Sequence, residues 1–182
     1  KVRKKYDSIR DAELKFFQRV KSELLKTNQS VSGTLYIKKE HKYRVELQGT
    51  TIVTDGVTVW SHSVANKQVL INKFKLDASA LTPERILGAA PTEYTASLAG
   101  TEKLGKIETQ VLKLVPKEEA SMVETMKFWV DAATWLIRKA EIVDVNGKQT
   151  TYFVNDIKVN TGIPDSRFTY KIPNGVEAVD LR

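Results

Sequence analysis

Residues 50–61 read TTIVTDGVTVWS, and this stretch decides the fold class. Asp55 and Gly56 separate two short runs rich in Val, Ile and Thr. An Asp-Gly pair supplies the positive φ angles of a two-residue type I′ turn, so the stretch predicts a β-hairpin. Asn146-Gly147, between LIRKAEIVDV and KQTTYFVNDI, predicts a second hairpin, and Asn66-Lys67 a third. These turns indicate a mainly β protein built on an antiparallel sheet.

Outward from this hairpin, apolar and polar residues alternate with a period of two. Leu14, Phe16, Gln18 and Val20 occupy one set of alternate positions, and 31–38 and 43–47 repeat the pattern. Such alternation is typical of strands with one apolar and one solvated face. Further strands are expected near 93–99, 107–115, 122–130 and 168–172. The total is roughly ten or eleven antiparallel strands in a single curved sheet.

Helical signals occur in two places. Val2, Tyr6 and Ile9 have helical spacing and predict an amphipathic helix near 1–11. At 82–88, Thr82 is an N-cap, Pro83 suits the first helical position and Gly88 ends the helix. No linker, repeat or change in composition interrupts residues 1–182, so we expect one domain of α+β character.

Composition narrows the class of protein further. Hydrophobic residues make up 41% and charged residues 28%, which is ordinary for a globular chain. No stretch approaches the ~18 apolar residues of a membrane span. No charged-then-apolar leader opens the sequence, so a signal peptide is expected to have been removed or never to have existed. The chain has no cysteine, which excludes disulfides, thiolate nucleophiles and Cys-ligated metals.

The net charge of +7 raises the question of an anionic partner. A basic run from Lys38 to Arg44 has Tyr36 and Tyr43 interleaved, as in strands that bind nucleic acids. The same residues also suit a charged hairpin tip with two tyrosines in the core or at an edge. The other cations are spread over nearly every strand, so we favour the hairpin tip and expect no nucleic-acid partner.

The residue types needed for catalysis are sparse. His41 and His62 are the only histidines, and neither lies in an HExxH motif or a His/carboxylate cluster, so no metal or cofactor is expected. Ser61 and His62 are neighbours on a predicted strand and therefore point to opposite faces. No GxSxG motif or glycine-rich phosphate loop is present. We therefore do not expect an enzyme, and a small enzyme acting on an apolar substrate is the less favoured alternative.

Ten strands with only two helices leave more apolar sheet face than the helices can cover. Burying an acyl chain gains on the order of 0.8 kcal/mol per CH₂, enough to favour filling such a face with lipid. The same apolar residues could instead form an ordinary core. The residues expected to line a lipid-binding hollow are Leu14, Phe16, Leu35, Ile37, Val45, Leu47, Ile52 and Phe128.

Five segments in order resemble the periplasmic outer-membrane lipoprotein carrier family, LolA. AELKFFQRV at 12–20 has an aromatic residue two positions before a glutamine, Phe16 and Gln18. The hairpin TTIVTDGVTVW, ending at Trp60, is the closest match. The other three segments are SGTLYIKKEHKYRVEL at 32–47, LTPERILG at 81–88 and FTYKIPNGVEAVDLR at 168–182.

The resemblance implies an unclosed half-barrel around a hydrophobic hollow, with a helical lid. It implies a monomeric periplasmic carrier that takes lipoprotein acyl chains from an inner-membrane lipoprotein-releasing transporter to an outer-membrane acceptor. It adds Tyr43 and Trp60 to the lipid-binding set. Lys39-Glu40 stands where the family has Arg-Pro, so Lys39 takes the place of an arginine that contacts the lid; lysine lacks the planar fork of that arginine. The alternative is a lipid-sensing or scaffold module of the same fold with no transfer role.

Overall fold

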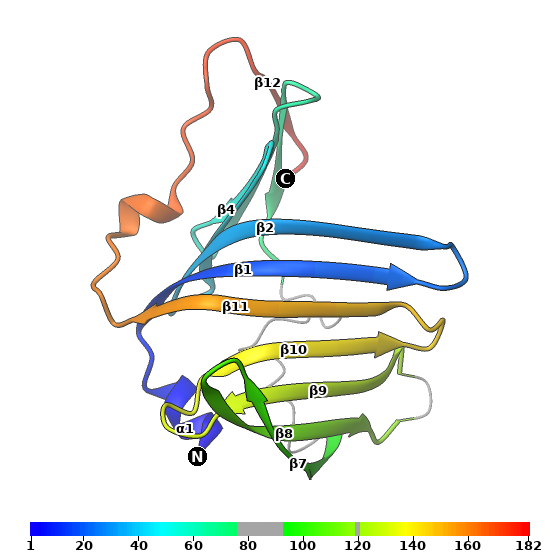
Figure 1. The fold of residues 1–182 in the computed structure, drawn as a ribbon. Helices are drawn as coiled ribbons and strands as arrows, with labels where there is room; N and C mark the ends of the chain where they lie inside the picture. Colours follow the sequence, from blue (N-terminus) through cyan, green and yellow to red (C-terminus); the bar gives the residue numbers. More distant parts are fainter. Residues whose placement is uncertain (76–92, 119–120) are drawn as a thin grey trace. The chain divides into compact units, whose positions relative to one another are not determined.

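The computed structural model describes residues 1–75, 93–118 and 121–182 (Figure 1). Strands dominate these residues, with one short α-helix and one 3₁₀ helix. The elements are α1 (Val2–Asp7), β1 (Asp11–Ser22), β2 (Thr27–Lys38), β3 (Lys42–Leu47), β4 (Thr50–Thr54), β5 (Thr58–Ser63), β6 (Gln68–Lys73), β7 (Tyr94–Leu104), β8 (Ile107–Pro116), β9 (Val123–Asp131), β10 (Ile137–Asp144), β11 (Gln149–Val159), η1 (Asp165–Phe168) and β12 (Glu177–Asp180).

The twelve strands form one sheet in the order β12-β6-β5-β4-β3-β2-β1-β11-β10-β9-β8-β7. The successive hairpins pair antiparallel, as the alternating sequence predicts. The exception is β12, which pairs parallel with β6. Since β12 and β7 end the order, the ladder of described strands does not close on itself. The predicted class, a mainly β fold with an unclosed sheet, is confirmed.

The chain forms two compact units, and each unit is built from segments that are separate in the sequence. The described residues of unit 1 are 1–8, 17–30, 93–118 and 121–155, and those of unit 2 are 9–16, 31–75 and 156–182. The strands β1, β2 and β11 each supply residues to both units. The single domain expected for 1–182 stays a prediction.

The three predicted hairpins are present, but two turns are longer than expected. The Asp55 carboxylate accepts from the N–H groups of Val57 and Thr58, both at 2.8 Å, so three residues separate β4 from β5. At the β10–β11 turn, only Gly147 has a positive φ, +72°. Four residues separate these strands, and loops of this length are most often built around a type I turn. The two-residue type I′ prediction is therefore wrong at both turns.

Two other expectations need correction. Residues 168–172 are not a strand, because Phe168 ends η1 and is fully buried, while the chain beyond it is irregular. The N-terminal helix ends at Asp7 and excludes Ile9, because β1 begins two residues after Ile9. The predicted helix at 82–88 lies outside the described residues.

Unit 1 has its core on one face of β8–β10. The buried residues of this core are Leu114, Met126, Phe128, Val130, Ile137 and Ile142. Val2 and Tyr6 of α1 pack against the cluster, and the N–H of Ile137 donates to the Tyr6 hydroxyl at 3.1 Å. Burial raises the pKa of that Tyr6 hydroxyl. The predicted amphipathic helix therefore caps the core of its own unit.

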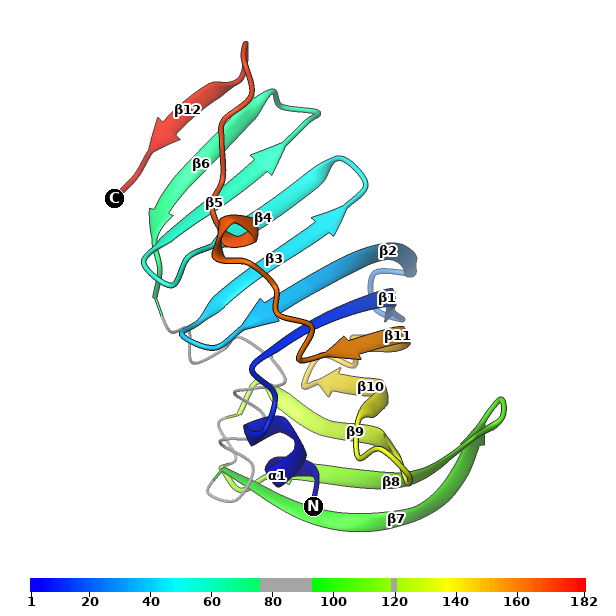
Figure 2. The ribbon, with the colours of Figure 1, turned by 90° about the vertical axis from the view of Figure 1, so that its left-hand side faces the viewer.

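Unit 2 has a core on the face of its sheet that carries Tyr36. The C-terminal segment, residues 160–176, crosses β3–β5 in Figure 2, and η1 packs on β3. Phe168 and Ile163 from this segment form a buried cluster with Tyr36 of β2. Lys38 fastens the segment by donating to the Ile163 carbonyl at 2.9 Å and to Asp165 at 2.7 Å. One face of unit 2 is thereby sealed by the chain itself.

Candidate functional site

The other face of unit 2 carries apolar side chains from strands β1–β4 and β6. Strand register places residues that lie directly opposite one another on the same face. Leu35 lies opposite Val45, which lies opposite Ile52 in the next strand. Ile37 is paired with Tyr43, and Leu70 joins the same face through its partner Ser61. We define the apolar face as Leu14, Phe16, Leu35, Ile37, Tyr43, Val45, Leu47, Ile52 and Leu70.

Phe16 is placed on this face by Gly33. A Cβ added to Gly33 would come within 2.9 Å of Phe16 Cζ and 2.5 Å of Leu47 Cδ2. The missing side chain at Gly33 therefore leaves room for both apolar groups against the backbone of β2. Leu14 shares the face because it lies two residues from Phe16 on β1. Eight of the ten predicted residues are thus brought together.

The apolar face is only partly shielded from solvent. All nine of its side chains are half-buried, whereas Val53, on the sealed face, is 0% exposed. The described residues of unit 2 supply a covering segment to the sealed face alone. A half-exposed face of this size is a candidate for binding an apolar ligand.

Two predicted residues lie elsewhere. Trp60 is opposite Val53 and Ile71 and therefore lies on the sealed face, so it does not belong with the other residues. Phe128 lies in the unit 1 core and is 3% exposed. Conversely, Leu70 was missed, because Val69 and Ile71 beside it are apolar too and hide the alternation.

The electrostatics of this face are those of an uncharged surface. Tyr43 is its most polar side chain, and burial raises the pKa of its hydroxyl. Ser61 carries its hydroxyl to the same face, opposite Ile52. A face without carboxylates or amines suits acyl chains, because burying an unpaired charge is strongly unfavourable.

The basic turn between β2 and β3 has a defined backbone. Glu40 and His41 adopt left-handed conformations with φ of 68° and 60°. The N–H of Lys39 donates to the Arg10 carbonyl at 3.1 Å, and the Lys39 side chain is exposed. Its ammonium forms no hydrogen bond or ion pair with a described residue. Lys39 is therefore free to reach another segment.

The other cations of this turn are neutralised locally. Lys42 pairs with Glu40 at 3.1 Å and with Asp165 at 3.5 Å. Arg44 pairs with Glu46 at 2.6 Å. The hydrogen bond from Lys38 lowers the pKa of Asp165. Lys38, Lys42 and Arg44 are thus paired with acidic side chains, and all three cations lie on the sealed face.

Neither histidine forms part of a catalytic or metal cluster within the described residues. Ser61 and His62 lie on opposite faces, as the sequence predicts, and His62 Nδ1 shares a 2.7 Å hydrogen bond with the Tyr170 hydroxyl. His41 stacks on Phe74 with ring centroids 5.5 Å apart. Across the described ranges, no group of three or more His, Asp or Glu side chains could hold a metal ion. Those ranges also contain no helix long and apolar enough to cross a membrane.

Comparison with known proteins assigns this arrangement to a family. The family of the outer membrane lipoprotein carrier protein LolA matches residues 7–171. The chain belongs to this family. LolA proteins are carriers without enzymatic activity, so the chain is not an enzyme.

Individual relatives agree with this assignment. The outer-membrane lipoprotein carrier proteins of Pasteurella multocida and Haemophilus influenzae are 29% and 30% identical to the chain, each over 170 residues. Each match covers 92% of this chain and 79% of the relative. An uncharacterized conserved protein from Thermus thermophilus has a crystal structure with a TM-score of 0.65 and 13% identity. That match covers 98% of this chain and 94% of the other and shows the fold alone.

Proposed function

We propose that this LolA-family protein is a periplasmic carrier that binds lipoprotein acyl chains on the apolar face of unit 2. It receives them from an inner-membrane lipoprotein-releasing transporter and delivers them, as a monomer, to an outer-membrane acceptor. The observation that carries the proposal is the asymmetry of unit 2. One face is sealed by Phe168 and Ile163, while the other keeps nine half-buried, mostly apolar side chains.

The energetics of acyl-chain binding suit this surface. Ten methylene groups removed from water contribute about 8 kcal/mol before the ordering of the chain is counted. The ladder from Leu35 through Val45 to Ile52 crosses three strands, which lie roughly 4.8 Å apart. The face can therefore contact an extended chain along several side chains. A non-directional apolar contact also tolerates acyl chains of different lengths.

Charge substitutions on the apolar face test this binding site. We expect Val45→Glu and Leu47→Glu to abolish binding of a fluorescent fatty acid, because a carboxylate desolvated by the acyl chain loses several kcal/mol. Val57→Glu is the matched control, since Val57 is 73% exposed at the β4–β5 turn. Unchanged binding by both variants, with circular dichroism showing an intact fold, would place the site elsewhere.

Release distinguishes a carrier from a sensor or scaffold. A carrier loaded with the fluorescent fatty acid transfers it to acceptor liposomes, so we expect fluorescence to move to the lipid fraction. Retention of the fatty acid by the protein in the presence of acceptor liposomes would indicate a sensing module without a transfer role.

A further inference from the structure

Three hairpin tips of unit 1 expose large apolar side chains. Leu24 and Leu25, in the turn between β1 and β2, are 77% and 70% exposed. Met122, in the β8–β9 connection, is 68% exposed, and Val145, in the β10–β11 turn, is 52% exposed. We call these four residues the tip patch. The labelled strands in Figure 1 show that the three tips lie at the same end of the unit.

The sheet order brings these tips together. The N–H of Val145 donates to the Met122 carbonyl at 3.2 Å, which joins two of them. The third is adjacent because β1 is next to β11. None of the four residues belongs to the buried cluster of unit 1 or packs against it. The turn at 23–26 is closed by polar contacts, including the Leu25 N–H to Ser22 Oγ at 3.3 Å, so its geometry does not require leucine.

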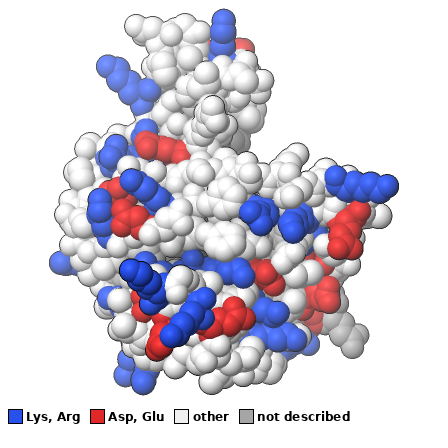
Figure 3. Space-filling view, viewed as in Figure 1, with Lys and Arg blue, Asp and Glu red and all other residues white. Residues whose placement is uncertain are grey.

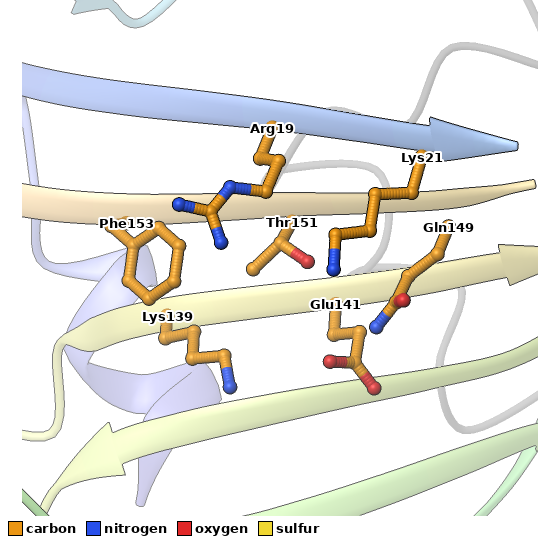
Figure 4. Close-up of a pocket in the computed structure, with 7 residues that line it drawn as sticks. All are labelled: Arg19, Lys21, Lys139, Glu141, Gln149, Thr151 and Phe153. Atoms are coloured by element: carbon orange, nitrogen blue, oxygen red, sulfur yellow. The ribbon is translucent and has the colours of Figure 1, made fainter. Parts of the chain in front are cut away.

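A cationic hollow lies on the sheet directly behind the tips. Arg19, Lys21 and Lys139 direct their charged groups over it in Figure 4. The hollow has a volume of about 170 Å³. Its lining residues are Arg19, Lys21, Lys139, Glu141, Gln149, Thr151 and Phe153. Lys21 and Gln149 lie next to the β1–β2 and β10–β11 turns, so the hollow opens beside the tip patch.

The cations of this hollow are largely uncompensated. Arg19 and Lys21 form no ion pair with a described residue, and Lys139 lies 3.7 Å above the Trp129 ring. Strand register adds Lys127 opposite Glu141, and Lys113 opposite Lys127. This face of β1 and β8–β11 therefore carries five cations against Glu141 near the tips. Figure 3 shows Lys and Arg side chains spread over the face with fewer acidic ones among them.

We propose that the tip patch and the cationic hollow dock unit 1 onto the surface of an anionic phospholipid bilayer. Leucines on narrow tips, with two cations, Lys21 and Lys26, and one acid, Glu23, beside them, can enter the boundary between headgroups and acyl chains. The cations of the hollow then face the lipid phosphates. A protein partner needs about 800 Å² of continuous surface on each side, which four side chains on separate turns do not provide. The docking surface is independent of where cargo is held.

Vesicle cosedimentation tests the docking surface. The full chain carrying Val45→Glu is mixed with vesicles of phosphatidylcholine and phosphatidylglycerol in equal amounts, or of phosphatidylcholine alone. This background removes acyl-chain binding at the apolar face, so failure of that site does not affect the result. We expect binding to the mixed vesicles only, weakened by salt. Leu24→Ser with Leu25→Ser is expected to reduce binding about tenfold or more, and Arg19→Gln with Lys21→Gln at least about fivefold.

The matched control is Val57→Ser with Val64→Ser, which removes two apolar side chains that are 73% and 58% exposed in unit 2. It is expected to bind the mixed vesicles as well as the Val45→Glu parent does.

Equal loss of binding in this control, or no cosedimentation of the parent with anionic vesicles, would overturn the proposal. So would a dimer in sedimentation equilibrium that Leu24→Ser with Leu25→Ser converts to a monomer, because the tip patch would then bind a second copy of the chain. Binding of inorganic phosphate without vesicle binding would likewise contradict docking.

Discussion

The resemblance to the LolA family implies a lid-contacting arginine at the position that Lys39 occupies. The Lys39 side chain is exposed and unpaired among the described residues, whereas the neighbouring Lys42 is held by Glu40 and Asp165. A free ammonium can donate to carbonyls at the end of a helix, a favourable place for a cation. We therefore propose that Lys39 holds a lid closed, in the place of the family arginine.

We predict that Lys39→Leu takes up a fluorescent fatty acid more readily and transfers it to acceptor liposomes more slowly. In this proposal, closing of the lid expels the cargo, and losing the Lys39 contact lowers the preference for the closed state by about 1 kcal/mol. The control is Lys73→Leu, because Lys73 is exposed and unpaired within the described chain, unlike Lys42. Transfer at the same rate in both variants would rule out a latch at Lys39.

Asp11 makes the stability of unit 2 sensitive to acid. Burial alone would raise the pKa of this carboxyl, but hydrogen bonds from Thr161 and Gly162 outweigh burial and lower it. A lowered folded-state pKa stabilises the protein above the unfolded-state value of about 4, and this stability is lost as pH falls through the folded-state pKa.

The midpoint urea concentration of unfolding is expected to fall between neutral and acidic pH. We expect this fall to be smaller in Asp11→Asn, because the variant has no carboxylate to protonate at this position. Asp7→Asn, at the exposed end of α1, is the control and should keep the acid sensitivity of the parent. If the urea midpoint of Asp11→Asn falls with pH as steeply as that of the parent, protonation of Asp11 does not cause the loss of stability in acid.

At the scale of elements, the C-terminal segment decides which face of unit 2 is available. Phe168 is 0% exposed and joins Tyr36 and Ile163. We predict that Phe168→Ala lowers the free energy of unfolding by about 4 kcal/mol in urea denaturation, because it leaves a cavity in a small cluster. Val64→Ala, at an exposed turn, should stay within about 0.5 kcal/mol of the parent. A loss below about 1 kcal/mol in Phe168→Ala would show that the segment is not anchored there.

The same elements show why sequence predicted some features and missed others. The Asp55-Gly56 and Asn146-Gly147 hairpins were predictable because turn residues act locally. The turn lengths were not, since the carboxylates of Asp55 and Asp144 accept N–H groups beyond a two-residue turn. The strand β12 was missed because its four residues pair with β6, more than a hundred positions earlier. Long-range pairing of so short a segment leaves no periodic signal.

The alternating pattern correctly grouped residues on one face where only one face of a strand is apolar. Leu35 and Ile37 alternate with Thr34, Tyr36 and Lys38, so the sequence predicted that Leu35 and Ile37 share a face. Trp60 was misplaced because β4 and β5 are apolar on both faces, with Ile52 beside Val53. The sealed face needs apolar residues to pack against the C-terminal segment that carries Phe168. The apolar face has apolar residues as well, so both faces of these strands are apolar. A period of two cannot tell these faces apart.

At the scale of the whole molecule, family membership and the apolar face support one account. The LolA family match spans residues 7–171, which includes every residue of the apolar face. Among the described residues, the C-terminal segment seals one face of unit 2, and the side chains of the opposite face are half-buried. An exposed apolar surface of this kind is unfavourable in water unless a ligand covers it. We therefore propose that a lipid covers that face.

Mass spectrometry of the lipids extracted from the purified protein tests this claim most directly. The parent protein, isolated from a bacterial envelope, is predicted to release acylated molecules in near-stoichiometric amount. The variant carrying both Val45→Glu and Leu47→Glu is predicted to release almost none, while Val57→Glu releases as much as the parent. A parent protein that yields no acylated molecule, or equal yields from all three proteins, would contradict lipid binding on the apolar face.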